Sequence, residues 1–190
     1  MELDRLLPVH DFRSCFTRRI AADPATVWRA LLDVTAEELP VSRRLMLLRT
    51  TGRNRLKGPF LDTFPTPTLS TVEGAELVKG MVAKFWRLRP PSAPIEPGDA
   101  DAFARFAEPG WAKAAMSLRV VPDGDATVVF FETRVQATDA RSRRIFRPYW
   151  LFIRLGGAAF IRVEVLRAVA RRAERAAATT DATDADGASG

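Results

Sequence analysis

The chain is poor in the side chains that most often bind metals or form covalent links. Its 190 residues include one cysteine, Cys15, and one histidine, His10. A single cysteine excludes an intramolecular disulfide and favours a reducing compartment, so we expect a cytoplasmic protein. Metal sites draw on several His, Cys or carboxylate ligands, and hydrolytic triads need a histidine beside a nucleophile. With one histidine, one cysteine and no G-x-S-x-G motif, the sequence predicts neither a catalytic triad nor a bound metal or cofactor.

Long uninterrupted apolar runs are missing as well. The most apolar stretch, residues 149–169, contains adjacent glycines and the charged side chains of Arg154, Arg162, Glu164 and Arg167. Such a segment is too polar for a membrane-spanning helix. The first eight residues are too acidic and too short in apolar length for a signal peptide. We therefore expect no stable membrane insertion.

Lysine is scarce, yet the chain is strongly basic. The net charge is +6 and the isoelectric point about 10.4, while lysine occurs only at positions 57, 79, 84 and 113, so most positive charge is arginine. A basic protein raises the possibility of nucleic-acid binding. The arginines, however, are dispersed among carboxylates rather than collected in one stripe with interleaved aromatic residues. We interpret them as solvated surface and expect no nucleic-acid partner.

The first half of the chain has patterns typical of both strands and helices. Residues 10–20 alternate as a strand does, and Asp23 followed by Pro24 is typical of a helix start. A second short helix is predicted over residues 36–48. Two further strands are expected, at residues 68–72 and 76–82.

The last third is predicted to be helical from residue 139 to about residue 175. Pro148 should kink or break its first turns, because the ring clashes with the carbonyl four residues earlier. After residue 176 the sequence is small, acidic and of low complexity. We therefore predict one domain over residues 1–176 and a disordered acidic tail over residues 177–190.

Residues 111–137 give the clearest local prediction, a hairpin that turns at Asp123-Gly124. Folding the chain there pairs Leu118 with Val129 and Met116 with Phe131 on one mainly apolar face. The opposite face carries polar and charged side chains, which we interpret as a cross-strand charge cluster on a solvated sheet surface. Those side chains are Lys113, Ser117, Arg119, Glu132 and Arg134.

Several stretches resemble the SRPBCC superfamily, which includes START-like lipid binders, pollen-allergen-like proteins and polyketide cyclases. The resemblance implies an α+β helix-grip fold, in which a curved antiparallel sheet wraps around a long C-terminal helix and encloses a cavity. The superfamily contains binders, transporters, cyclases and dehydratases, so the resemblance implies no single activity. The stretch that resembles the opening motif of the superfamily is Ile20-Ala-Ala-Asp-Pro-Ala-Thr-Val-Trp28. The stretches that resemble a bacterial branch of it are Gly80…Lys84-Phe85-Trp86, Phe103-Ala-Arg-Phe106…Pro109-Gly110-Trp-Ala-Lys113, Glu132-Thr-Arg134-Val and Thr138-Asp139…Tyr149-Trp150.

Arg162 is the side chain that most suggests a ligand, since it falls in the middle of an apolar helical arc. A guanidinium facing a cavity could hold a ligand carboxylate or phenolate through two hydrogen bonds. Alternatively, Arg162 extends past the rim of the sheet into solvent. Tyr149 would add a polar group to the site, and the walls would come from Trp86, Met116, Phe131 and Trp150. For each aromatic residue, ordinary core packing is the competing interpretation.

The sequence therefore predicts the binding of a small hydrophobic ligand, lipid- or polyketide-like, in a cavity under the C-terminal helix. The first alternative is a cyclase- or dehydratase-type enzyme, which a buried titratable pair in the cavity would favour. No cyclase catalytic set can be matched residue by residue, so catalytic residues stay unassigned. The second alternative is a protein-partner module that uses the arginine-rich face of residues 139–175. The oligomeric state stays open.

Overall fold

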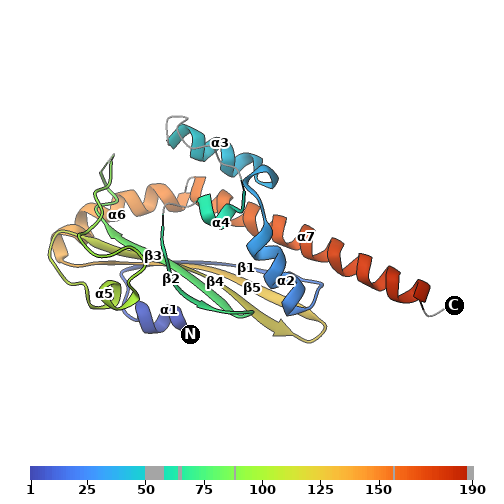
Figure 1. Ribbon diagram of the computed structural model, residues 1–190. Coiled ribbons are helices and arrows are strands. Elements are labelled where there is room, and N and C mark those ends of the chain that lie inside the picture. The colour runs from blue at the N-terminus through green and yellow to red at the C-terminus, as the bar shows by residue number, and fades with distance from the viewer. Residues whose placement is uncertain (50–57, 64–65, 88, 156, 188–190) are drawn as a thin grey trace. The chain divides into compact units, whose positions relative to one another are not determined.

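The computed structural model describes residues 1–49, 58–63, 66–87, 89–155 and 157–187 (Figure 1). It confirms the α+β class, with a five-stranded antiparallel sheet in the order β1-β5-β4-β3-β2 and a long C-terminal helix. In chain order the elements are α1 (Glu2–Leu6), β1 (Phe12–Ile20), α2 (Pro24–Asp33), the 3-10 helix η1 (Ala36–Glu38), α3 (Pro40–Arg49), α4 (Phe60–Thr63), β2 (Thr68–Val72), β3 (Glu76–Ala83), α5 (Ala100–Arg105), β4 (Ala112–Asp123), β5 (Ala126–Ala137), α6 (Ala140–Leu155) and α7 (Gly157–Gly187).

The elements form two compact units. The first comprises Met1–Phe16, Pro65–Arg119 and Phe130–Ala159, and thus α1, β2, β3, α5, α6 and most of β1, β4 and β5. The second comprises Thr17–Phe64, Val120–Val129 and Phe160–Gly190, and thus α2, η1, α3, α4 and most of α7. Helix α7 continues to Gly187, past the domain end expected at residue 176, and the disordered tail stays a prediction.

In the first unit, β3 and β4 pair antiparallel, from Glu76 opposite Arg119 to Ala83 opposite Ala112. Successive side chains of a strand point to opposite faces of the sheet, so this register defines two surfaces. We call them the α1 face and the α6 face, after the helix that packs on each. The α1 face carries Glu76, Val78, Gly80 and Val82 of β3 with Lys113, Ala115, Ser117 and Arg119 of β4; the α6 face carries the residues between them.

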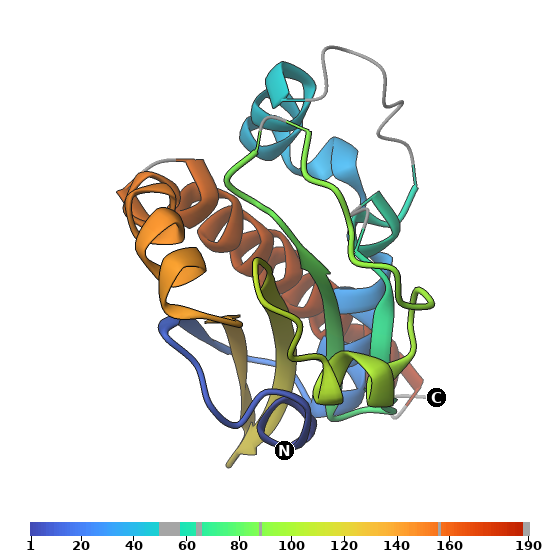
Figure 2. The same ribbon diagram turned by 90° about the vertical axis from the view of Figure 1, so that its left-hand side faces the viewer.

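Two short helices cover the α1 face. Helices α1 and α5, which are far apart in the sequence, lie side by side there (Figure 2). Leu3, Leu6 and Leu7 are fully buried in one cluster with Val78 and Phe103. Burial of such side chains contributes about 1.5–3 kcal/mol each. The N-terminal leucines therefore attach α1 firmly to the sheet.

The α6 face is covered by the aromatic side of α6. Phe146 and Trp150 are buried there against Ala112 and Val135. These two side chains flank Pro148, which lies inside α6 and does not end it. Of the predicted kink or break, the break does not occur, and the kink stays a prediction. Packing on both sides of the proline offsets the hydrogen bond that its missing N–H removes from the helix.

The hairpin is confirmed, but its turn lies one residue later than expected. Strand β4 runs to Asp123 and β5 begins at Ala126, so the turn residues are Gly124 and Asp125. Gly124 has a φ of 63°, which glycine adopts without strain. A turn moved by one residue shifts each predicted pair by two positions, and so every side chain keeps its face.

In the second unit, the predicted start of α2 is confirmed. The Asp23 carboxylate accepts a hydrogen bond from the Thr26 amide at 2.9 Å, and Pro24 is the first helical residue. This cap stabilises a helix by about 1 kcal/mol, because it gives an otherwise unbonded amide a partner.

The helix predicted over residues 36–48 is divided into η1 and α3, since Pro40 begins a new helix. Side chains of α7 hold both pieces. Glu164 accepts hydrogen bonds from the amides of Val41 and Ser42, at 2.9 and 2.7 Å, and Arg172 forms a 2.6 Å ion pair with Glu38. An acidic side chain at the first turn of a helix is stabilised by the helix dipole.

Candidate functional site

Three of the predicted ligand residues surround Phe146 in the first unit. Its ring centroid lies 6.5 Å from that of Trp86, 5.4 Å from that of Tyr149 and 6.2 Å from that of Trp150. Phe12 of β1 joins the same group at 5.1 Å from Phe146. Trp150 is buried, whereas Trp86 and Tyr149 are half-buried. The structure thus brings these three together as an aromatic core.

The other three predicted ligand residues lie outside this aromatic group. Phe131 is buried and Met116 is half-buried on the α6 face, where Met116 stands opposite Lys79 of β3. Arg162 belongs to the second unit and is half-buried in α7. Burial lowers the pKa of its guanidinium to about 10. The role of Arg162 as an anion-binding group stays a prediction.

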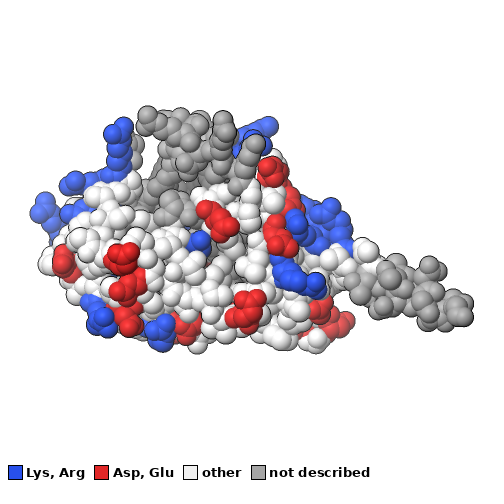
Figure 3. Space-filling view, in the orientation of Figure 1, with Lys and Arg blue, Asp and Glu red and all other residues white. Residues whose placement is uncertain are grey.

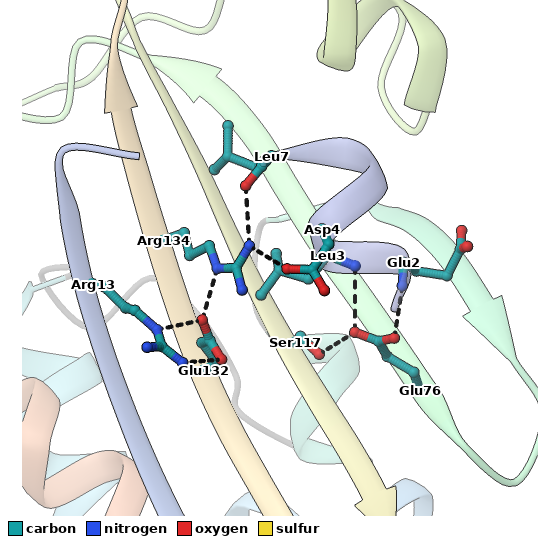
Figure 4. A network of polar contacts seen from close by, with 9 residues as sticks. All are labelled: Glu2, Leu3, Asp4, Leu7, Arg13, Glu76, Ser117, Glu132 and Arg134. Atoms are coloured by element: carbon teal, nitrogen blue, oxygen red, sulfur yellow. Dashed lines mark hydrogen bonds and ion pairs between the residues drawn. The ribbon is translucent and has the colours of Figure 1, made fainter. Parts of the chain in front are cut away.

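The α1 face contains a buried ionic network centred on Glu132 of β5 (Figure 4). Arg13 binds the Glu132 carboxylate through two hydrogen bonds, at 2.7 and 3.1 Å, and Arg134 donates to it at 2.7 Å. Arg134 also forms a 2.7 Å ion pair with Asp4 and donates to the carbonyl of Leu7. Burial raises the pKa of Glu132, but hydrogen bonds from both arginines outweigh it and lower the pKa overall.

A second buried carboxylate, Glu76 of β3, binds the first turn of α1. It accepts hydrogen bonds from the Glu2 amide at 2.8 Å and from the Ser117 hydroxyl at 2.7 Å. The Leu3 amide approaches the same carboxylate at 3.4 Å. Glu76 is only 4% exposed, so these donors replace the water that its charge would otherwise need. Both carboxylates therefore attach α1 to the sheet.

The prediction of a solvated charge cluster on this face is wrong. Lys113, Ser117, Glu132 and Arg134 are all buried, because α1 and α5 lie over them. The leucines at positions 3, 6 and 7 have helical spacing and were the available indication of a covering helix. A five-residue helix gives a weak sequence pattern, which explains why the prediction missed it.

Lys113 is the one buried lysine of this face in the described chain. Its ammonium group donates to the carbonyl of Ala104 at 2.7 Å and lies 5.4 Å from the ring centroid of Phe103. Burial lowers the pKa of Lys113. Since both contacts are with α5, the lysine ties that helix to β4.

A pocket of about 130 Å³ opens beside the same core. Its walls are mainly apolar and come from β2, β3, α5 and the segment 92–99. Polar groups lie at the exposed rim, where Asp99 also accepts a hydrogen bond from the Ala102 amide as the cap of α5. The lining residues are Pro67, Leu69, Gly80, Met81, Val82, Ser92, Ala93, Ile95, Glu96, Pro97, Gly98, Asp99 and Phe103, none of which is among the six predicted ligand residues.

Backbone contacts hold the pocket wall in place. The segment after β3 returns along that strand, with the Ala93 amide donating to Val82 at 2.9 Å. Across the pocket, Gly80 leaves no room for a larger residue: a Cβ there would lie 2.6 Å from a methyl carbon of Leu69 and 3.0 Å from the Ala114 carbonyl oxygen. No local pattern in the sequence indicates this packing role of Gly80.

Asp139 is the cap of α6, which begins at Ala140. Its carboxylate accepts hydrogen bonds from the amides of Ser142, at 2.8 Å, and Gly110, at 2.5 Å, and from the Ser142 hydroxyl. These hydrogen bonds lower the pKa of Asp139 to about 2. One carboxylate therefore connects the start of α6 to the residues before β4.

Two findings limit the chemistry available to the described chain. In it, no three His, Cys, Asp or Glu side chains lie close enough together to hold a metal ion. None of its helices combines the length and apolarity that crossing a membrane requires.

Comparisons with known proteins add little to this geometry. No family model matches the sequence, and no curated protein matches it. Among solved structures, the chain is similar to the crystal structure of TTHA0849 from Thermus thermophilus, with 12% identity and a TM-score of 0.33. That likeness covers 87% of this chain and 99% of the other.

Proposed function

We propose that this chain binds a small, largely apolar ligand and places one apolar group of it in the pocket between β3 and residues 92–99. The observation that carries the proposal is the pocket itself: an apolar wall, closed by Leu69, Val82 and Phe103, with its polar groups at the rim. Ligand sites in proteins have this character, apolar inside and with a few polar groups that orient the ligand.

The size of the pocket limits its occupant. Cavities near 150 Å³ lined by aliphatic and aromatic side chains hold a benzene-sized molecule, so about 130 Å³ suits a ring or a branched alkyl end. Removing about 150 Å² of such a group from water contributes on the order of 4 kcal/mol. Alone, that corresponds to a dissociation constant of about 1 mM. A tighter ligand must therefore extend beyond the pocket.

Binding is better supported than catalysis. A cyclase- or dehydratase-type enzyme needs a titratable pair that faces the substrate in a desolvated site. In this pocket the carboxylates of Glu96 and Asp99 are exposed at the rim, and Asp99 serves as a helix cap.

The fold proposed for this function is of the helix-grip type. An antiparallel five-stranded sheet and a long C-terminal helix support that assignment, as does the resemblance of several stretches to the SRPBCC superfamily. The cavity that this fold type implies under the C-terminal helix is a separate expectation from the pocket described above. Arg162→Ala should then weaken the binding of an anionic ligand by about 1–3 kcal/mol. Unchanged affinity would remove Arg162 from the site.

The first experiment asks what the protein carries. Native mass spectrometry of the purified chain, followed by denaturing extraction, should reveal a stoichiometric hydrophobic adduct. The second experiment locates the pocket by titrating toluene into methyl-labelled protein. Methyl signals of Leu69, Val82 and Ile95 should shift, while that of Leu151 on the exposed side of α6 should not.

A variant that fills the pocket tests whether toluene binds there. Ser92→Phe adds a ring at the rim of the pocket, and Thr71→Phe adds the same ring at an exposed position of β2 as a control. Only Ser92→Phe should suppress the toluene shifts. The proposed function would be refuted if the purified protein carried no adduct and its methyl signals did not shift with toluene.

A further inference from the structure

Helix α6 has an unusual combination of side chains on its outer side. Its sequence, ARSRRIFRPYWLFIRL, contains five arginines and no acidic residue. This departs from the expectation that the arginines are dispersed among carboxylates. In Figure 3, Lys and Arg side chains gather over the part of the surface where Figure 1 draws α6.

The buried and exposed residues of α6 form opposite faces. Ser142, Phe146 and Trp150 are buried and recur every four positions, so together they face the sheet. The residues on the opposite side of the helix, at positions 141, 144, 145, 148, 151 and 152, are exposed. The buried side attaches the helix, and the exposed side forms a continuous outer stripe.

Large apolar side chains lie on this outer stripe. Phe152 is 77% exposed, Leu151 55% and Ile145 41%. A soluble surface seldom gathers large exposed apolar groups in one helix, and such a patch marks an interaction site. They lie mainly in the C-terminal half of α6.

Four of the five arginines lie in the N-terminal half of the same helix, beside the apolar groups. Arg141, Arg143, Arg144 and Arg147 are exposed. Within the described chain, only Arg143 of these four forms an ion pair, with Asp11 at 2.6 Å. The outer side of α6 thus carries uncompensated positive charge next to exposed aliphatic and aromatic groups.

We propose that α6 docks on the surface of a membrane that contains anionic lipids. A helix with arginines beside Phe and Leu lies in the interfacial plane, where its apolar groups enter the acyl boundary and its cations meet lipid phosphates. Nucleic acid would satisfy the arginines but would leave Phe152 and Leu151 without an apolar environment. A second copy of this chain would bring like charges together. An anionic membrane matches both features.

The test measures co-sedimentation with vesicles of equimolar phosphatidylcholine and phosphatidylserine, against pure phosphatidylcholine vesicles. The wild-type chain should bind the anionic vesicles, and added salt should weaken binding. Each arginine near such a surface contributes about a fivefold gain, so Arg144→Gln with Arg147→Gln should weaken binding about 25-fold. Phe152→Ser should weaken it on the order of 30-fold, because a largely exposed ring would no longer enter the lipid.

Matched controls separate this surface from general charge and hydrophobicity. Arg105→Gln removes an exposed arginine from α5, and Val72→Ser removes an exposed apolar residue from β2. Both controls should bind like wild type. All five substituted side chains are exposed, so unfolding is not expected, and far-ultraviolet circular dichroism checks it.

Three outcomes would overturn the proposal. One is equal binding to neutral and anionic vesicles, or no binding to either. Another is tight binding of a DNA duplex that survives Phe152→Ser, which would assign the arginines to nucleic acid. The third is self-association by analytical ultracentrifugation that Phe152→Ser abolishes, which would assign the stripe to a second copy. None of these outcomes bears on the ligand pocket.

Discussion

Removing both members of the buried Glu132–Arg134 pair should cost clearly less than the sum of the two single removals. Their side chains are 6% and 7% exposed, and neither can be rehydrated without displacing α1. Their further partners differ: Arg13 and Asp4, which bind Glu132 and Arg134 respectively, have side chains that are 53% and 50% exposed. Water can therefore solvate these outer partners once the inner pair is gone.

The expected magnitudes follow from which charge each variant leaves behind. Loss of one partner of a buried pair costs about 3–5 kcal/mol when the other is left uncompensated. Glu132→Leu should cost about 3 kcal/mol, the lower end, because Arg134 keeps Asp4. Arg134→Met should cost about 2 kcal/mol, since Glu132 keeps two hydrogen bonds from Arg13. The double variant should cost about 2 kcal/mol rather than the sum, giving a coupling near 3 kcal/mol.

The assay is urea denaturation of the wild type and the three variants at neutral pH. The free energies of unfolding are compared provided that their slopes against urea concentration are equal. The pH dependence gives a second readout. Because the folded-state pKa of Glu132 is lowered from 4.5, its stabilisation is present above that value and is lost as pH falls through the lower folded pKa. The double variant should lack this acid-sensitive part. Single costs that add to within about 0.5 kcal/mol would refute the argument.

Three further predictions concern separate sites. Asp139→Ala should destabilise the protein by about 1 kcal/mol and Asp139→Asn by less, measured by urea denaturation, because only the amide still caps α6; the wild-type contribution should be full above pH 3.8 and lost toward pH 2. The wild type should become more stable as pH rises from the lowered folded-state pKa of Lys113 toward 10.5, because the buried ammonium group loses its charge. Lys113→Met should lack this rise, and melting temperatures measured across that pH range check it. Gly80→Ala should destabilise by about 1–3 kcal/mol, because its Cβ would meet Leu69 and a backbone carbonyl; an unchanged melting temperature would show that the wall adapts.

Local elements could be read from the sequence because their causes are local. The cap at Asp23 and the start at Pro24 act within one helical turn, so α2 was predictable. The faces of the hairpin were predictable for the same reason, since alternation depends on neighbouring residues alone. Its turn was misplaced by one residue because both Asp123-Gly124 and Gly124-Asp125 offer the glycine that a tight turn requires.

The candidate site was predictable only in its residue types. The sequence identified Trp86, Trp111, Tyr149 and Trp150 as one set of aromatic groups. The structure brings three of them together around Phe146, whereas Trp111 packs against Phe106. The sequence offered no indication of the pocket beside β3. That pocket depends on segment 92–99 folding back along the strand, which no local pattern in the segment predicts.

By itself the sequence determined the α+β class, the caps, the order of the main elements and the two faces of the hairpin. Tertiary structure alone decided that Glu132 and Arg134 are buried. Their cover is α1 with Leu7, the residue that follows it; Leu7 lies 127 residues away along the chain from Arg134, to which it is hydrogen-bonded. Alternation along a strand shows which side chains share a face. Whether that face meets water depends on a distant segment, because burial is a property of the packed chain and not of the strand.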